Sequence, residues 1–574
     1  MIFDSFNKIL EIIDLKTKRL ILLVFLSSIF SIFFEALSIG MVIPLISAVT
    51  DPQYFSKFPL FKDLTNHFMD DESYQGKIFF LLIVIIIIFS FKILFIIIHT
   101  LLKLKLVHDF NLKLQKTLFS KYLDLSWSQY LEKKSSKMIR NIQNETSIIK
   151  NKIVDSLITL FAEVLLFFSI VLLLIFTIPK ITLGILSVII LIGVLTYKIM
   201  KKKIVIYSIK RLSSGAKIFN YIIESLQSFK DIYIYNKQDF FKKKYYEQSK
   251  IFHNVQKNIG WINSLPRIFL EALGYFAIIT VIYISIRSNL EKQQLITTLG
   301  LFLVAITRLI PTVSKLVVAI QKLDEGQIAL ENIYNEVKEK NTIGNFIKSN
   351  FNYDEQDFNE SIELKNIKFT YPGKEESIIE NLNFILKKNT SNAIYGPSGI
   401  GKSTIIDIVS GLHHPEVGQI FIDGKLNSNI KDFWKNKISY VGQKNYLFSG
   451  NLLTNITLKT DPSKDDISEV RKILDFCNLN KFNIDSKINE MGMNLSGGEG
   501  QRISIARALF NEPSFLIFDE ATNSLDKETE KEILNLLISL KRKITLLLIS
   551  HDKNVVNYCD NIFELRNKKL EKIK

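Results

Sequence analysis

Cysteine is scarce in this chain of 574 residues, which contains only Cys477 and Cys559. The two lack the paired spacing of metal ligands, so the sequence predicts no cysteine-held metal site. We also expect no removable leader, because roughly the first 18 residues are of mixed polarity and the apolar run behind them is longer than the core of a signal peptide. We therefore expect that run to remain in the protein as a membrane anchor.

Acidic residues are outnumbered by basic ones, 57 against 73, which gives a formal net charge of +16 at pH 7. Such an excess is typical of proteins that bind nucleic acid. Much of it, however, consists of lysines in the segments that flank apolar runs, and this is the pattern that the positive-inside rule predicts. We therefore expect a membrane among the partners, and no nucleic acid.

Hydrophobic residues make up 47% of the chain and charged residues still reach 23%, which indicates a very apolar part joined to a soluble one. Six apolar runs precede residue 325, and each has the roughly 20 residues that a ~30 Å hydrocarbon core requires. They are residues 20–49, 78–102, 153–178, 181–200, 267–287 and 295–321.

The segments between these runs differ in charge and length. Residues 103–152 and 201–266 are lysine-rich with few glycines and prolines, so we expect them to be helices that continue into the cytoplasm. Short amphipathic turns at 123–131 and 224–236 would rest on the soluble part. Residues 51–77 would face outward, with an amphipathic helix at 54–68. The expected domains are 1–336, a polar linker at 337–360, and 361–574.

A glycine-rich motif of the form G-x-x-x-x-G-K-[ST] follows an apolar run and opens a helix-like stretch. Its glycines let backbone N–H groups turn toward a phosphate, and the helix N-terminus adds its dipole. The lysine can reach the outer phosphates and the serine can ligate Mg²⁺. The motif and the residue after it are Gly396, Pro397, Ser398, Gly399, Ile400, Gly401, Lys402, Ser403 and Thr404.

More motif residues follow in a fixed order: Gln443, the run 495–498, the acidic pair Asp519 and Glu520, and His551. One short glycine motif can arise by chance, whereas this ordered set within roughly 155 residues indicates an ATPase. His551 by itself would be an ordinary histidine. It gains meaning from the apolar run before it, residues 544–550, which follows the acidic pair.

In these motifs the region 355–574 closely resembles the nucleotide-binding domain of ABC transporters. The resemblance implies that Tyr371 stacks on adenine, that the phosphate loop binds ATP, and that Ser403, Gln443 and Asp519 hold Mg²⁺. Glu520 would be the catalytic base, assisted by Gln443 and by the switch histidine, His551. Further family contacts are implied at 490–492, an exporter loop, and at 524–526, a dimer-contact loop.

The family's signature sequence would complete the nucleotide site of an opposing subunit. Its residues here are Ser496, Gly497, Gly498 and Glu499, with glutamate where the family more often has glutamine. Six spans and one such cassette form half of an exporter. The expected fold is therefore an α-helical membrane domain of the ABC exporter type with an α/β phosphate-loop domain, and the simplest assembly is a homodimer. The sequence leaves a heterodimer open.

Four basic residues lie within or at the edge of the apolar runs: Lys92, Arg267, Arg308 and Lys315. A cation inside a span is costly and normally serves a cavity or a partner, so we take these residues as candidates for binding an anionic cargo. The alternative is structural: Arg267 can pair with a glutamate four residues on, and Lys315 can extend toward the interface. The carboxylates at positions 35, 163 and 271 are too few to neutralise the whole basic set.

A lipid-linked pyrophosphate fits such a path, and the membrane half resembles the bacterial flippase for lipid-linked oligosaccharides of protein N-glycosylation. Residues 34–35, 42–46, 265–274 and 308–311 carry this resemblance, and lysine at 92 and 315 departs from it. It implies a bacterial cytoplasmic membrane. The alternatives are a general lipid, lipid A-type or multidrug exporter. A peptide exporter would carry a peptidase domain with a catalytic cysteine before the first span, and the six spans argue against an ABC ATPase of repair or translation.

Overall fold

The computed structural model describes residues 2–50, 74–177, 179–287, 292–339, 358–371, 373–427, 430–434, 437–489, 492–521 and 526–574. The helix expected at 54–68 lies outside these ranges, as does most of the expected linker. The chain divides into two compact units. The helical unit comprises Met1–Leu125 and Lys133–Asn341, and the cassette unit comprises Ser126–Glu132 and Thr342–Lys574.

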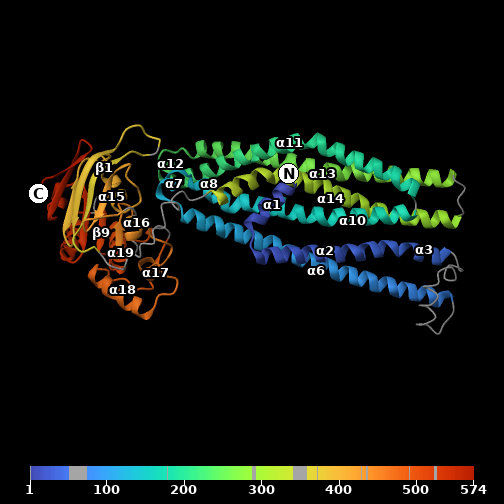
Figure 1. The fold of residues 1–574 in the computed structure, drawn as a ribbon, viewed down its shortest axis with the longest axis horizontal. Coiled ribbons are helices and arrows are strands. Elements are labelled where there is room, and N and C mark those ends of the chain that lie inside the picture. The colour runs from blue at the N-terminus through green and yellow to red at the C-terminus, as the bar shows by residue number, and fades with distance from the viewer. Residues whose placement is uncertain are drawn as a thin grey trace. The chain divides into compact units, whose positions relative to one another are not determined.

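The helical unit consists of long helices that lie alongside one another (Figure 1). Neighbouring pairs are α2 with α6, α10 with α14, α11 with α13, and α13 with α14. The helices are α1 (Ile2–Ile12), α2 (Leu15–Gly40), α3 (Val42–Thr50), α6 (Tyr74–Leu123), α8 (Ser135–Arg140), α9 (Thr146–Ile148), α10 (Asp155–Thr177), α11 (Pro179–Gln227), α12 (Phe229–Ile234), α13 (Gln238–Arg287) and α14 (Lys292–Lys338), with π-helical turns η1 (Asn141–Glu145) and η2 (Ile149–Val154).

The predicted spans at 78–102, 181–200, 267–287 and 295–321 each fall within one helix. The span at 20–49 is divided between α2 and α3, and the described part of the span at 153–178 covers the end of η2 and α10. Among the described residues, five helical stretches are long and apolar enough to cross a membrane, and the predicted span at 181–200 lies in α11, whose first turns are only partly described. A helix satisfies its backbone hydrogen bonds internally, so it can carry exposed apolar side chains through a hydrocarbon layer.

The predicted continuation of the helices beyond the spans is confirmed, because α6, α11 and α13 each extend to about 50 residues. Their extensions are held by an apolar core of their own. Leu114 of α6, Ile153 of η2 and Leu330 of α14 are almost completely buried in it, and Ile9 packs α1 against the same core.

The cassette unit contains a six-stranded sheet of order β12-β11-β3-β10-β9-β6, parallel except for β12, and an antiparallel sheet of order β2-β1-β4-β5. Two apolar cores pack in this unit. The strands are β1 (Ser361–Phe369), β2 (Ile379–Lys387), β3 (Ser391–Tyr395), β4 (Val417–Ile422), β5 (Lys425–Leu426), β6 (Ile438–Val441), β7 (Gly450–Asn451), β8 (Lys487–Ile488), β9 (Phe515–Asp519), β10 (Thr545–Ser550), β11 (Asn561–Arg566) and β12 (Lys569–Lys572).

Helices join these strands, and the short helix α7 of the segment between α6 and α8 belongs to the same unit. The helices are α7 (Trp127–Glu132), α15 (Lys402–Val409), α16 (Ile430–Phe433), α17 (Leu452–Thr457), α18 (Lys464–Phe476), α19 (Gly497–Phe510), α20 (Lys527–Leu540) and α21 (Lys553–Val556).

The residues just before position 361 contact the cassette unit. Phe358 is buried in its core beside Trp434. The backbone N–H groups of Asn359, Glu360 and Ser361 all donate to the carboxylate of Asp423. The last residues of the expected linker are therefore fixed to the cassette.

Candidate functional site

The phosphate loop is the turn between β3, which ends at Tyr395, and α15, which begins at Lys402. Gly399 and Gly401 have φ angles of 79° and 112°, a region that side chains other than glycine rarely adopt. A Cβ at Gly401 would lie 2.7 Å from Cγ2 of Ile378. Glycine is thus required both for the backbone path and for the space at the start of α15, where free N–H groups can receive a phosphate.

Lys402 is 5% exposed and its ammonium group lies inside the loop. Nζ donates to the carbonyl oxygens of Gly396 at 2.7 Å and Pro397 at 3.1 Å. It also lies 3.3 Å from Oε1 of Glu520. The predicted phosphate-binding cation and the predicted catalytic base therefore meet at one point.

The adenine-stacking candidate Tyr371 lies next to the same helix, and its hydroxyl is 3.1 Å from Oγ1 of Thr404. Its ring packs edge-on against Phe369, at 5.1 Å between centroids, and against His413, at 5.4 Å. Sequence reasoning did not identify His413, which is 2% exposed and has no motif of its own.

The acidic pair follows β9 and the switch histidine follows β10, and these strands are parallel neighbours, so their carboxyl ends meet at one edge of the sheet. Nε2 of Gln443 donates to Oε2 of Glu520 at 3.4 Å, and Nδ1 of His551 is 3.9 Å from Oε1 of Glu520. Glu520 itself has a positive φ of 48°. The three predicted catalytic residues are thus brought together around one carboxylate.

Asp519 is mostly buried, and burial raises the pKa of its carboxyl above the usual range. Tyr440 donates its hydroxyl to Asp519 at 3.0 Å, and burial with the nearby Asp519 charge raises the pKa of Asp407 to about 6. Neither Tyr440 nor Asp407 was found from the sequence: Tyr440 is brought here by the pairing of β6 with β9, and Asp407 by the packing of α15 against the same edge of the sheet.

The oxygen ligands predicted for Mg²⁺ are those that a hard cation prefers. In the described part of the chain no three His, Cys, Asp or Glu side chains converge as a ready-made metal cage. The predicted donors are the hydroxyl of Ser403, the carboxylate of Asp519 and the amide of Gln443, which are the oxygen donors that a Mg²⁺ shared with phosphate oxygens would need.

The signature residues begin α19, with Ser496 as its N-cap and Gly497 and Gly498 in its first turn. Oγ of Ser496 accepts from the N–H of Glu499 at 3.3 Å, and Oε2 of Glu499 accepts from the N–H of Ser496 at 2.7 Å. Lys481 forms an ion pair with Glu499 and is the main cause of the lowered pKa of its carboxyl, together with the N–H of Ser496. The departure from the common glutamine is thus a capping box with a counter-charge.

The signature and the phosphate loop are not joined within one chain. In the described residues, no hydrogen bond or ion pair links Ser496 or Glu499 to the loop at 396–404; their contacts run to each other and to Lys481. Of the two further family contacts, the exporter loop at 490–492 lies mostly outside the described residues, and the loop at 524–526 is described only at its last residue.

The four cations of the membrane runs all contact carboxylates. Glu35 serves two of them: Nζ of Lys92 lies 2.8 Å from Oε2 and Nε of Arg308 lies 3.1 Å from Oε1. Lys92 and Glu35 are buried, whereas half of the Arg308 side chain is exposed. Because one carboxylate serves two cations, the small number of carboxylates does not leave any of the four without a partner.

The other two cations form simpler pairs. Nζ of Lys315 lies 2.6 Å from Oε1 of Glu163, a buried residue of α10. Nε of Arg267 donates to Oε1 of Glu271 at 2.6 Å, one helical turn on, and most of the arginine is exposed. This last pair is the structural alternative that the sequence spacing predicted.

Two family models match the chain: the ABC transporter transmembrane region over residues 20–311, and the ABC transporter family over residues 379–523. The lactococcin-G-processing and transport protein LagD of Lactococcus lactis is 30% identical over 62% of this chain and 51% of its own length. The lipid A-core flippase of Wigglesworthia glossinidia brevipalpis is 27% identical over 63% and 62%. The chain thus spans about half to three fifths of these relatives.

A solved structure of a bacterial Atm1-family ABC exporter with ATP bound superimposes with a TM-score of 0.76 at 19% identity. The superposition covers 96% of this chain and 94% of that one. At this level of identity the likeness establishes the fold: a transmembrane helical domain with an ATP-binding cassette.

Proposed function

This chain belongs to the ABC transporters, and from that membership we propose that two copies of it form an ATP-driven membrane exporter. The observation that carries the proposal is the position of Glu520, whose carboxylate lies 3.3 Å from Lys402 and 3.4 Å from Gln443. A cation, a carboxylate and an amide at one point are what phosphoryl transfer to water requires.

Each residue of this group has a definite task. Lys402 and the N–H groups that open α15 bind the outer phosphates of ATP. Glu520 orients the attacking water and accepts its proton, and His551 holds that carboxylate in place. Ser403 and Asp519 would hold Mg²⁺, which neutralises phosphate charge when it is bound.

The second copy follows from the separation of the signature from the phosphate loop. Ser496 caps α19, and the N–H groups of Gly497 and Gly498 in its first turn have no acceptor within the helix, so they are available to an anion. Since the contacts of these residues do not reach the chain's own loop, they serve the nucleotide of a partner. A symmetric pair in which each copy completes the other's site is the simplest closed assembly.

Hydrolysis is tested with Glu520→Gln, which should bind ATP normally and lose nearly all turnover in the purified, reconstituted protein. Lys402→Ala should instead weaken ATP binding, because the phosphate charge loses its cation. Normal hydrolysis by Glu520→Gln would remove the residue as catalytic base.

Shared sites are tested by mixing variants. Ser496→Arg should be inactive alone, because its bulk meets the partner's γ-phosphate, and Lys402→Ala should be inactive alone for lack of phosphate binding. A mixed dimer keeps one intact composite site and should recover ATPase activity. Mixtures as inactive as either parent would contradict a productive shared site.

For the cargo we propose a lipid-linked oligosaccharide, flipped across a bacterial cytoplasmic membrane. Arg308 and Lys315 support it, because they are half exposed despite their carboxylate partners and lie seven residues apart on one face of α14. The relative named as a lipid A-core flippase favours the alternative, a general lipid exporter. Flipping assays in vesicles that contain either a fluorescent lipid-linked oligosaccharide or a lipid A analogue distinguish the two cargoes. Flipping of the lipid A analogue alone would contradict the oligosaccharide proposal.

A further inference from the structure

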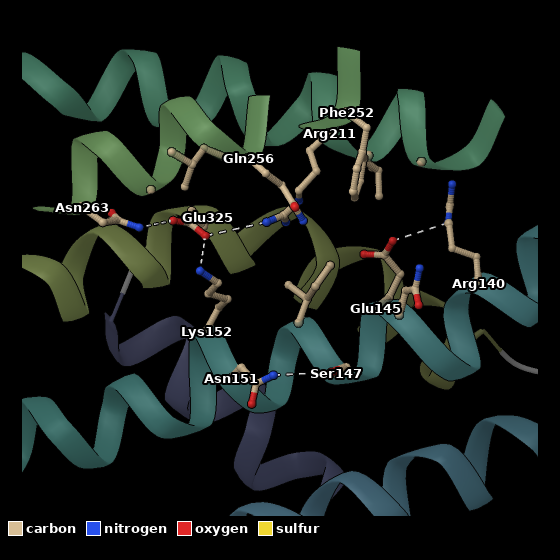
Figure 2. A pocket seen from close by; sticks show the side chains of 16 residues that line it. Arg140, Glu145, Ser147, Asn151, Lys152, Arg211, Phe252, Gln256, Asn263 and Glu325 are labelled. Carbon is tan, nitrogen blue, oxygen red and sulfur yellow. Dashed lines mark hydrogen bonds and ion pairs between the residues drawn. The ribbon is translucent and has the colours of Figure 1, made fainter. Parts of the chain in front are cut away.

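A cavity of about 500 Å³ lies within the helical unit (Figure 2). Four stretches of chain line it: residues 140–152, 211–215 of α11, 252–263 of α13, and Glu325 of α14. Each stretch lies just beyond a predicted span, on the side assigned to the cytoplasm. Its volume falls within the ~300–1,000 Å³ that is usual for small-molecule sites.

One wall of the cavity is organised by Glu325, which is 1% exposed. Its carboxylate lies 2.6 Å from Nζ of Lys152 and 3.7 Å from Nη1 of Arg211, and it accepts from Nδ2 of Asn263 at 2.9 Å. A single buried carboxylate thus connects η2, α11 and α13 to α14. The wall is fixed by these bonds, which is the condition for a preformed site.

The helical run that carries Lys152 also carries Glu145, which is 2% exposed and lies 3.4 Å from Nε of Arg140. Both Glu145 and Lys152 are on π-helical turns, η1 and η2, of one helical run. Such turns are rare and occur frequently at functional sites, because the extra residue changes where a side chain is directed. Figure 2 shows Glu145 and Lys152 on the helical run that borders one side of the cavity, with Arg211 across from them.

Two buried acceptors at the cavity have unmet hydrogen-bonding capacity. Within the described residues, Oε2 of Glu145 and Oδ1 of Asn263 have no hydrogen-bond partner. The same holds for Nε of Arg140 and Oε2 of Glu325, but these two atoms lie in ion pairs. A flip of the Asn263 amide would not satisfy Oδ1, because Nδ2 must stay where it donates to the carboxylate of Glu325, which can only accept. Buried acceptors are normally satisfied, so these two call for a ligand that donates hydrogen bonds.

The charges that line the cavity narrow the ligand further. The positive charges of Arg140, Lys152 and Arg211 disfavour a polyamine. The carboxylates of Glu145 and Glu325 disfavour a bare phosphate, which is negatively charged and can only accept hydrogen bonds. Hydroxyl and amide groups donate and accept without a net charge, so they suit both signs at once. The exposed face of Phe252 adds an apolar surface to the lining.

We propose that this cavity binds the saccharide of the cargo, as a hydroxyl-rich headgroup, on the cytoplasmic side; the proposal rests on the oligosaccharide cargo proposed above. Gly260 gives access to it, since a Cβ there would meet no atom within 4 Å. Glycine inside a long helix is less stable than alanine by about 0.5–1 kcal/mol. A glycine at this place therefore leaves room at the expense of helix stability.

Gly260 also supplies the test, because larger residues fit there without a clash at Cβ and favour the helix. Three probes are bound to reconstituted protein: a lipid pyrophosphate with an N-acetylated oligosaccharide, the same lipid pyrophosphate without it, and the free oligosaccharide. Gly260→Leu should weaken binding of both saccharide probes by about tenfold or more and leave the plain lipid unchanged. Gly260→Ala, the matched control, should bind all three as the native chain does, with basal ATPase activity retained throughout.

A second pair of variants tests the donor argument without filling the cavity. Glu145→Gln keeps an acceptor oxygen and should retain saccharide binding, whereas Glu145→Ala should lose it. If the ligand were instead a cation, both variants would lose binding, because both remove the negative charge. If Gly260→Leu binds both saccharide probes as the native chain does, the proposed saccharide site is wrong. It is also wrong if Gly260→Leu loses binding of the plain lipid pyrophosphate to the same extent. Neither result would contradict the proposed cargo. Failure of the unaltered protein to flip the lipid-linked oligosaccharide would overturn the cargo, and the site with it.

Discussion

The hydroxyl of Ser128 lies 3.2 Å from Nδ1 of His413. Ser128 is in α7, which connects two long helices of the helical unit yet belongs to the cassette unit, so the amphipathic turn predicted at 123–131 is confirmed as a cassette contact. His413 in turn packs against Tyr371. We therefore expect a movement of α7 to affect the ring of Tyr371, which we propose stacks on adenine.

His413→Ala should raise the KM for ATP about two- to tenfold, because an aromatic contact of about 0.5–1.5 kcal/mol no longer supports Tyr371. The value of kcat should change little, since Glu520 and Lys402 are untouched. ATPase assays over a range of ATP concentrations separate the two constants. His414→Ala, at the exposed neighbouring position, is the control.

His413→Phe separates the ring from its hydrogen bond. It keeps the packing on Tyr371, so the KM for ATP should stay near the native value, but it cannot bond to Ser128. Cargo-stimulated ATPase activity should then fall while basal activity persists. Equal KM values for His413→Ala and the native protein would show that the ring does not position Tyr371.

In the dimer proposed above, the ion pair of Lys481 with Glu499 should neutralise the negative charge of Glu499 beside the γ-phosphate that the other copy binds. Lys481→Ala should raise the KM for ATP by roughly two- to fivefold at low salt and by less at high salt, because exposed charges are screened. Adding Glu499→Gln should restore the native KM, since the uncompensated charge is gone. Lys472→Ala, which breaks an ion pair with Glu469 elsewhere, is the matched control.

The raised pKa of Asp407, about 6, predicts a stability cost with a definite pH window. The native state binds the proton more tightly than the unfolded chain, so the cost grows between about pH 4 and pH 6 and is constant above. Asp407→Asn should therefore stabilise the protein at pH 8 by about 1–3 kcal/mol in the free energy of unfolding, which is seen as a higher melting temperature. Near pH 4 the melting temperature should be unchanged. Melting is measured without nucleotide and with a chelator.

Asp423 provides the control of opposite sign. Burial alone would raise the pKa of its carboxyl, but the donating N–H groups of Asn359, Glu360 and Ser361 outweigh burial and lower it. Asp423→Asn should lower the melting temperature at pH 8. A stabilised Asp423→Asn, or an Asp407→Asn that melts like the native chain at pH 8, would contradict this account.

The residues that sequence reasoning identified belong to motifs of fixed spacing and order, or pair within one helical turn. The phosphate loop needs its spacing within one turn, and Arg267 with Glu271 needs only one helical turn. Tyr440, Asp407 and His413 could not be found in this way, because the fold, rather than any spacing, places them beside the motif residues. Glu35 likewise joins two cations only when helices far apart in sequence are packed together.

That arrangement at Glu35 divides the membrane cations into two kinds. Lys92 is 6% exposed and has its carboxylate partner within the helix bundle, so we expect the pair to be structural. Glu35→Ala should leave a buried cation without its partner and cost about 3–5 kcal/mol of stability. Thermal unfolding in detergent, followed by tryptophan fluorescence, measures the loss; a melting temperature equal to the native one would contradict a structural role.

Arg308 is the opposite case, because half of its side chain is exposed and its removal leaves Glu35 paired with Lys92. The free energy of unfolding of Arg308→Ala should therefore lie within about 1 kcal/mol of the native value. Its rate of cargo flipping should fall about tenfold or more, as expected when a charge-assisted contact to an anion is removed. Arg308→Lys should retain more flipping than alanine and less than arginine, because lysine keeps the charge without the fork. Flipping in vesicles beside basal ATPase activity gives the readout. An Arg308→Ala protein that flips its cargo at the native rate would place the anion elsewhere and return Arg308 to the structural set.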